Sequence, residues 1–274
     1  MLARTGFGAQ AATVNRRPPL ALGLTLGLLL ATPARAGETA CWFENGAVVV
    51  PAEVAGVAGD WLLDPSARHT QLHETRAQMD GLPPAFRATA HLAGVSLADV
   101  PVTVANLDGR APGFATPIAG VIGADVLGRY VIEVDFVPCR VRLIAEGSGR
   151  RPGRGTRMIR LTQVDGVPTL AAAVSDDRRA RRGLFALDFS ARAAVRLTRA
   201  TFRPENRPAE TASRNRAPGR LRALSFDGAL YEEPTAALAP DLEPDLAGAL
   251  GTDLWSRWRI SLDIRRGRLL LSPK

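Results

Sequence analysis

Two aspartates of this 274-residue chain stand in closely similar sequence surroundings and could act as a pair. Asp64 follows the apolar run Trp61–Leu63 and Asp188 follows the apolar run Phe185–Leu187, and Ser and Ala come two and three positions after each acid. Two carboxylates within about 3 Å of one another cannot both ionise, so they share one proton. Such a pair can activate a water for attack on a peptide carbonyl, because the ionised acid removes a proton while the protonated acid hydrogen-bonds the carbonyl oxygen.

A second motif also occurs twice, later in each half of the chain. Residues 121–125 read Val-Ile-Gly-Ala-Asp, and residues 249–253 read Ala-Leu-Gly-Thr-Asp. Each copy is followed by an apolar segment that ends in an acid, Asp135 in the first half and Asp263 in the second. Two motifs that recur in the same order indicate two homologous lobes, and each lobe then offers one acid at an equivalent place.

This arrangement resembles the aspartic-protease fold of the pepsin and retropepsin families, and it is most similar to the bacterial retropepsin-like group. The resemblance covers nearly all of the chain after about residue 45. It implies an all-β protein of two homologous lobes with a cleft between them and few short helices. It also implies that Asp64 and Asp188 are the catalytic acids, that Gly123 and Gly251 pack behind the catalytic loops, and that no cofactor or metal takes part.

The residues after both acids depart from the family pattern of Asp-Thr-Gly or Asp-Ser-Gly. Pro65 and Phe189 replace the hydroxyl residue, and Ser66 and Ser190 replace the glycine whose amide approaches the carboxylate. Neither proline nor phenylalanine carries a hydroxyl, proline lacks an amide hydrogen, and a serine side chain adds bulk. Two hypotheses follow. The protein is an aspartic endopeptidase acting on a peptide or protein substrate, or it is an inactive homologue that binds an extended peptide or a protein partner in the interlobe cleft.

The N-terminus has the pattern of an export signal. Arg16 and Arg17 precede the apolar run 20–31, and the segment 32–36 offers an Ala-x-Ala site. We expect cleavage after Ala36, a periplasmic or secreted protein, and no membrane association after cleavage. An apolar run of about 12 residues is short for a bilayer, yet an uncleaved anchor is the alternative.

The chain contains two cysteines, Cys41 and Cys139. In an exported protein such a pair predicts a disulfide, which would connect the mature N-terminus to the end of the first lobe. Two free buried thiols are the alternative.

The expected organisation is a signal peptide at 1–36, a first lobe at 37–146, a linker at 147–156 and a second lobe at 157–274. We predict helix after each late glycine and at 72–79 and 197–202. Candidate substrate-covering flaps are the segments 108–117 and 203–222. The strands predicted by apolar and β-branched residues are 47–50, 61–64, 100–105, 131–135, 140–144, 184–188 and 268–271.

Other chemistries are less well supported by the sequence. The net charge of +8 includes four arginines of the expected signal, and the arginine-rich stretches 150–157 and 203–222 contain Pro, Gly and Ala, so we expect solvated loops, no nucleic-acid partner and a monomer. His69 and His73, with Glu74 beside them, have a spacing that suits zinc, but no second motif supplies further ligands. Ser66 near His69 lacks an oxyanion loop, and no phosphate-binding glycine loop precedes a helix. Trp255 and Trp258 are expected to belong to the core.

Overall fold

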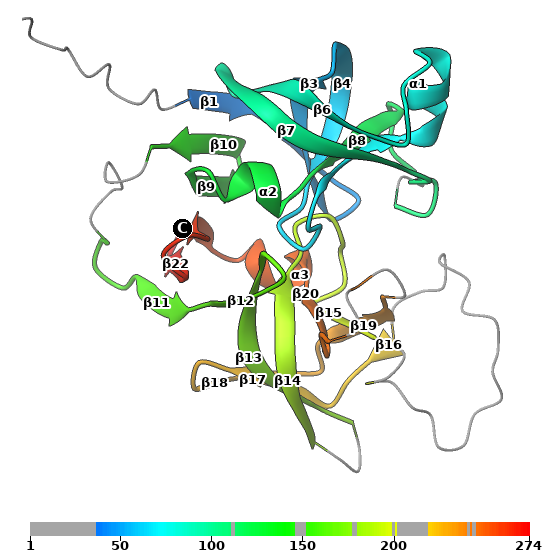
Figure 1. Ribbon diagram of the computed structural model, residues 1–274. Helices are drawn as coiled ribbons and strands as arrows, with labels where there is room; N and C mark the ends of the chain where they lie inside the picture. The colour runs from blue at the N-terminus through cyan, green and yellow to red at the C-terminus, as the bar shows by residue number, and fades with distance from the viewer. Residues whose placement is uncertain are drawn as a thin grey trace, which may run out of the picture. The chain divides into compact units, whose positions relative to one another are not determined.

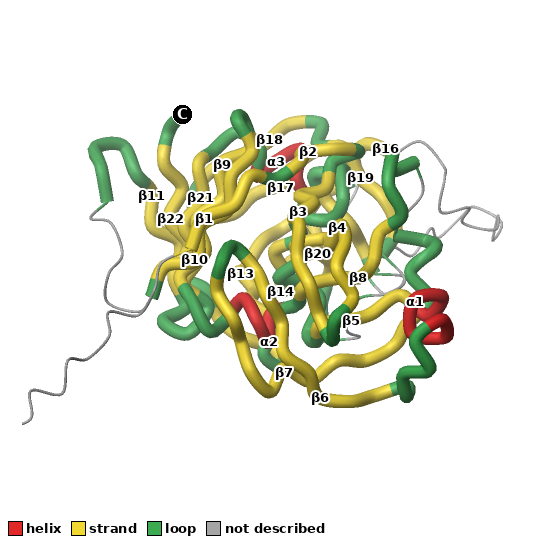
Figure 2. Tube along the Cα trace, turned by 90° about the horizontal axis from the view of Figure 1, so that it is seen from above, coloured by secondary structure: helices red, strands yellow, loops and turns green. Residues whose placement is uncertain are grey.

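The computed structural model describes residues 37–110, 113–145, 152–176, 180–198, 201, 219–239, 242 and 245–274. The expected signal peptide, most of the expected linker and most of the candidate flap 203–222 lie outside these residues. Strands dominate the described chain and the helices are short, as Figure 2 shows. Within this part of the chain no helix has the length and apolar character needed to cross a membrane.

The first lobe is built around a seven-stranded sheet in the order β2-β3-β4-β8-β5-β7-β6, and a further β3–β6 pairing closes it on itself. Its two short helices are α1 (Glu74–Met79) and α2 (Ala124–Leu127). The strands are β2 (Trp42–Glu44), β3 (Ala47–Val54), β4 (Val57–Leu63), β5 (Thr70–His73), β6 (Ala85–Leu92), β7 (Val95–Ala105) and β8 (Ile118–Ile122).

The second lobe repeats this path with a sheet ordered β16-β19-β15-β20-β14-β13-β17-β18, in which β12 also pairs with β13 (Figure 1). Helix α3 (Thr252–Trp255) takes the place of α2. The strands are β12 (Thr162–Val164), β13 (Val167–Ser175), β14 (Ala180–Leu187), β15 (Val195–Leu197), β16 (Gly219–Arg220), β17 (Ala223–Phe226), β18 (Ala229–Glu232), β19 (Thr235–Leu238) and β20 (Gly248–Leu250).

A third sheet joins the two halves of the chain in the order β1-β10-β9-β21-β22-β11. Its central pair is antiparallel, with Ile260 of β21 opposite Val134 of β9. Each half therefore contributes three strands. They are β1 (Gly37–Ala40), β9 (Val131–Phe136) and β10 (Cys139–Ile144) from the first half, and β11 (Arg157–Arg160), β21 (Arg259–Asp263) and β22 (Arg268–Ser272) from the second.

One buried core runs through both lobes and the joining sheet. It includes Trp61 and Phe136 from the first half and Phe185, Phe189 and Trp255 from the second, all almost inaccessible to solvent. A disulfide links Cys41 to Cys139, as the sequence predicts. It holds the start of β2 against the start of β10, where the Cys41 amide also donates to the Cys139 carbonyl.

The all-β, two-lobed architecture confirms the predicted fold class, and a short helix follows each late glycine. Two local predictions are wrong. The helix predicted at 197–202 begins in strand β15, and residues 199, 200 and 202 lie outside the described chain. Strand β5 extends to His73, which caps α1, so the helix predicted at 72–79 begins only at Glu74.

Candidate functional site

The two acids lie at equivalent strand ends in the two lobes. Strand β4 runs parallel to β8, and the amide of Asp64 donates to the carbonyl of Ile122 at 3.0 Å. Strand β14 runs parallel to β20, and the amide of Asp188 donates to the carbonyl of Leu250 at 2.9 Å. The apolar runs before the acids anchor these strands in the core, because a strand buried on both faces is apolar throughout.

Gly123 and Gly251 sit behind the loops that carry the acids. A Cβ atom at Gly123 would lie 2.6 Å from the backbone of His69 and 2.8 Å from the Ala67 carbonyl oxygen. At Gly251 it would lie 2.1 Å from the Ala193 carbonyl oxygen. Such separations are far below van der Waals contact, so only glycine lets the second motif pack directly against each acid loop.

The serines that replace the family glycines keep the amide contact and add a hydroxyl. The Ser66 amide donates to Asp64 Oδ1 at 2.8 Å, and the Ser190 amide donates to Asp188 Oδ1 at 2.8 Å. Ser66 Oγ lies 2.7 Å from the same Asp64 oxygen. Each serine therefore keeps its amide hydrogen bond to the acid, and its added hydroxyl forms a further hydrogen bond with a carboxylate oxygen.

Ser190 brings the two acids together. Its Oγ lies 3.0 Å from Asp64 Oδ2 and 3.0 Å from Asp188 Oδ1. A hydroxyl carries one proton, so it can donate to only one of these two oxygens. The other contact is satisfied when that carboxyl is itself protonated and donates to Oγ, which is the arrangement of two acids sharing a proton.

Each acid is also paired with an arginine. Arg110, from the candidate flap segment 108–117, donates through Nη2 to Asp64 Oδ2, and the same nitrogen lies 2.8 Å from Ser190 Oγ. Arg196, from strand β15, donates to Asp188 Oδ2. The acid side chains are 0% exposed, and those of Arg110 and Arg196 are 18% and 12% exposed. The site is therefore a nearly dry cluster of two carboxylates, two guanidinium groups and one bridging hydroxyl.

Burial controls the protonation of the first acid. Loss of hydration raises the pKa of Asp64, and the neighbouring Asp188 carboxylate raises it further. The Arg110 guanidinium and the hydrogen bonds from Ser66 oppose this rise without cancelling it. The neutral form of Asp64 is thus favoured relative to a solvated aspartic acid, in agreement with a proton held between the two acids.

Pro65 and Phe189, which replace the hydroxyl residues of the family pattern, are both buried. Phe189 is fully buried and its ring packs edge-on against Phe136, with centroids 6.3 Å apart. Its carbonyl accepts a hydrogen bond of 2.8 Å from the amide of Val48 in the other lobe. A backbone bond and aromatic packing therefore connect the lobes beside Asp188.

Further contacts pack each acid loop against a hairpin turn of the opposite lobe. Thr252 Oγ1 donates to the Gly46 carbonyl, which lies in the turn between β2 and β3. Arg68 donates to the Asp165 carbonyl at 2.7 Å and forms an ion pair with its carboxylate, in the turn between β12 and β13. The lobes are thus held together around the acids by polar contacts from both sides.

The acid of the second motif has a structural contact in each lobe. Asp125 accepts from Thr70 Oγ1 at 2.8 Å, and Asp253 accepts from Thr235 Oγ1 at 2.8 Å. Thr70 begins β5, directly after the first acid loop, whereas Thr235 begins β19 and also accepts from the Ala194 amide at the end of the second acid loop. Sequence reasoning identified the repeated aspartates but not their threonine partners.

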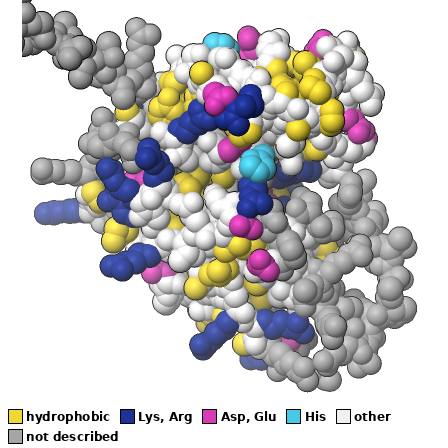
Figure 3. All heavy atoms as spheres, in the orientation of Figure 1, with side chains coloured by type: hydrophobic (Ala, Val, Ile, Leu, Met, Phe, Trp, Pro, Cys, Tyr) yellow, Lys and Arg dark blue, Asp and Glu magenta, His cyan; other side chains and the backbone are white. Residues whose placement is uncertain are grey.

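The other constellations of the sequence do not assemble into a site. His73 Nδ1 accepts from the Thr75 amide, and its Nε2 faces Asp108 at 3.1 Å. No group of three or more His, Cys, Asp or Glu side chains suited to a metal ion occurs among the described residues. Trp255 is buried in the core and Trp258 packs against it, as expected. On the face drawn in Figure 3, basic side chains are interspersed with acidic ones.

Comparisons with known proteins place the fold but not a family. No protein-family model matches the chain, and no curated protein matches its sequence. Among solved structures, the aspartic proteinase from Irpex lacteus is similar, with a TM-score of 0.54 and 12% sequence identity over 88% of this chain and 98% of that chain. The chain therefore has the two-lobed fold of a pepsin-like aspartic proteinase.

Proposed function

We propose that the protein is an exported, non-hydrolysing homologue of aspartic proteinases that binds an extended peptide or a protein segment. The observation that carries this proposal is the position of Ser190. Its hydroxyl contacts both carboxylates at 3.0 Å, where a peptidase of this fold would need a free water between the acids. The attacking water can take this place only after the Ser190 side chain changes rotamer, which breaks both contacts.

The arginines add to this argument. General-base catalysis requires an acceptor oxygen that is free to take a proton from water. Both carboxylate oxygens of Asp64 and Oδ1 of Asp188 each have two hydrogen-bond partners. Asp188 Oδ2 accepts from Arg196, which lies on a regular strand. Retention of both acids is then explained by their contacts with Arg110 and Arg196, because removing one partner of a buried ion pair is strongly destabilising.

The disulfide between Cys41 and Cys139 supports an oxidising compartment, in keeping with the predicted cleavage after Ala36. We propose a periplasmic or secreted monomer with lobes at 37–146 and 157–274.

A binding experiment tests the proposal. Fluorescently labelled, unstructured peptides of about 10 residues are titrated with the mature protein and with Asp64→Asn, and the peptides are analysed afterwards by mass spectrometry. We expect saturable binding to both proteins and intact peptides. Absence of binding, or shortened peptides with the wild type but not with Asp64→Asn, would overturn the proposal.

A second candidate is an aspartic endopeptidase whose acids are capped by Arg110. Two observations favour it: the acids share one hydroxyl, and the pKa of Asp64 is raised as proton sharing requires. Arg110 comes from a loop segment rather than a strand, so its removal exposes Asp64 while leaving Arg196 in place. Peptide cleavage between about pH 3 and 7 that appears in Arg110→Ala and disappears in Arg110→Ala/Asp64→Asn would establish this candidate.

A further inference from the structure

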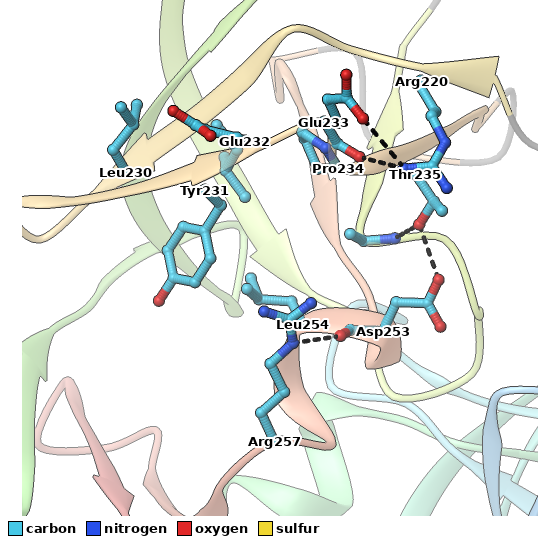
Figure 4. Close-up of a pocket in the computed structure, with 12 residues that line it drawn as sticks. Arg220, Leu230, Tyr231, Glu232, Glu233, Pro234, Thr235, Asp253, Leu254 and Arg257 are labelled. Carbon is cyan, nitrogen blue, oxygen red and sulfur yellow. Dashed lines mark hydrogen bonds and ion pairs between the residues drawn. The ribbon is translucent and has the colours of Figure 1, made fainter.

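The second lobe contains a cavity of about 620 Å³ between β18 and α3, away from the two acids (Figure 4). This volume lies within the range of small-ligand pockets. Its apolar wall includes Leu224, Leu230 and Leu254, and Tyr231 adds a ring that stacks on Phe226 with centroids 5.1 Å apart. Its charged lining side chains are Arg220, Arg257, Glu232, Glu233 and Asp253.

The first lobe shows what fills the equivalent place. Arg129, which follows α2, reaches across to β7 and donates to the carbonyls of Ala98 at 2.9 Å and Asp99 at 3.2 Å. The two nitrogens of one guanidinium thus bind two successive carbonyls. This fork geometry is specific to arginine.

Three residues around Arg129 in the first lobe have counterparts around the cavity of the second lobe. Asp99 and Glu233 both have a positive φ, 57° and 47°, and each forms an ion pair with an arginine. Those partners are Arg87 for Asp99 and Arg220 for Glu233. Arg129 stands four residues after Asp125, as Arg257 stands four residues after Asp253.

In the second lobe Arg257 is the equivalent of Arg129, but its hydrogen bond goes to a carbonyl of α3 rather than to the carbonyls of a neighbouring strand. Arg257 Nε donates to the Asp253 carbonyl at 3.3 Å, and among the described residues Arg257 forms no hydrogen bond with a carbonyl of β18. The Glu233 carbonyl accepts from Arg220 at 3.1 Å. The Asp99 carbonyl accepts from two arginines at once, so the Glu233 carbonyl has capacity for a second donor.

We propose that this cavity binds the side chain of an arginine presented by a peptide or protein partner. The guanidinium would take the place that Arg129 takes in the first lobe and donate to the carbonyls of Glu232 and Glu233. Asp253 is paired with Arg192 and Glu233 with Arg220, whereas Glu232 has no ion-pair partner among the described residues. The apolar wall suits the aliphatic stem of arginine.

The inference deepens the proposed binding function by naming the residue that is recognised, and its test is independent of the acids. The probe is the tripeptide acetyl-Ala-Arg-Ala-amide, and the matched control replaces arginine by its neutral isostere citrulline. Binding is followed by the amide NMR signals of the mature protein. We expect changes around Glu232 and Glu233 with the arginine peptide, and affinity about tenfold lower for citrulline because charge-assisted hydrogen bonds are lost.

Three variants sharpen the test. Glu232→Gln should weaken arginine binding by about fivefold, whereas Glu53→Gln, a change on β3 of the first lobe, should leave it unchanged. Arg257→Ala removes a positive charge from the cavity lining, so binding should be equal or tighter. Equal affinity for arginine and citrulline, no effect of Glu232→Gln, or loss of binding in Arg257→Ala would each overturn the inference. If the tripeptide binds this cavity while longer peptides do not bind the protein, the cavity proposal stands and the proposed function fails.

Discussion

The two lobes follow the same chain path but secure their acids with arginines from different places. In the second lobe Arg196 lies on strand β15 and pairs with Asp188. The equivalent position on β5 is Gln71. Arg196 precedes Leu197, which pairs with Gly248, and Gln71 precedes Leu72, which pairs with Gly120. The first lobe instead takes Arg110 from a loop after β7. Backbone positions and tight glycines are thus shared, whereas the polar partners of the acids are specific to each lobe.

A similar contrast holds for the arginine after the late helix. Arg129 closes the gap between α2 and β7, while the equivalent gap in the second lobe remains a cavity. Only the first lobe is crosslinked by a disulfide. The comparison indicates that the first lobe is restrained by the disulfide and its loop by the ion pair between Arg110 and Asp64, whereas the second lobe has an open cavity.

The largest expected effect tests the disulfide of the first lobe. Replacing Cys41 and Cys139 together by serine removes a crosslink over 98 positions, and we expect a loss of about 4 kcal/mol in the free energy of unfolding. Urea denaturation under oxidising conditions measures this loss. A difference below about 1 kcal/mol would mean that the crosslink does not restrain the unfolded chain as the loop-closure model requires.

The shared glycines should be equally sensitive in both lobes. Gly123→Ala and Gly251→Ala force a Cβ atom against backbone carbonyls, so we expect each to cost about 3 kcal/mol. Gly153→Ala is the matched control, since its Cβ would meet only Thr156 Oγ1 at 4.0 Å. Thermal unfolding of the three variants gives the comparison. A marked difference between the stability losses of Gly123→Ala and Gly251→Ala would show that the two acid loops are not packed equivalently.

The acids themselves should not be equivalent. Asp188→Asn removes the carboxylate with which the nearly buried Arg196 forms an ion pair, and we expect a loss of about 3 kcal/mol at pH 7. Asp64→Asn should cost less, because burial already raises the pKa of Asp64 and favours its neutral form. Urea titrations of both variants, with Asp188→Asn/Arg196→Gln as the compensated control, measure the difference. A larger loss for Asp64→Asn would contradict this ranking.

The smallest effect is a pH dependence. Because the pKa of Asp64 is higher in the folded than in the unfolded protein, its contribution to stability is fully present below the unfolded value of about 3.8 and is lost as pH rises through the folded value. The stability of the wild type relative to Asp64→Asn should therefore fall as pH rises from about 4 to 7. Chemical denaturation at several pH values tests the sign, and a rising difference would show that Arg110 outweighs burial.

The sequence predicted the fold because its strongest signals are local and repeated. Apolar runs before Asp64 and Asp188 and the glycines at 123 and 251 mark positions where backbone packing tolerates little variation. The disulfide was predictable for the same reason, since the chain has only two cysteines.

The partners of the acids were not predictable from the sequence. Arg110 lies 46 positions after Asp64 in an irregular segment, and no periodicity connects the two. Arg196 stands eight positions after Asp188 on the strand that borders the acid loop, but the matching residue of the first lobe is Gln71, so the repeat did not mark Arg196 as a partner. Ser190 appeared as a bulky substitute for glycine, whereas its hydroxyl joins both acids.

The central claim is that the bridging hydroxyl of Ser190 prevents hydrolysis by the two acids. Its most direct test is digestion of an unfolded protein by the wild type, Asp64→Asn and Asp188→Asn between about pH 3 and 7, with fragments counted by mass spectrometry. We predict that all three proteins leave the substrate intact. Fragments that appear with the wild type and vanish with both variants would contradict the claim.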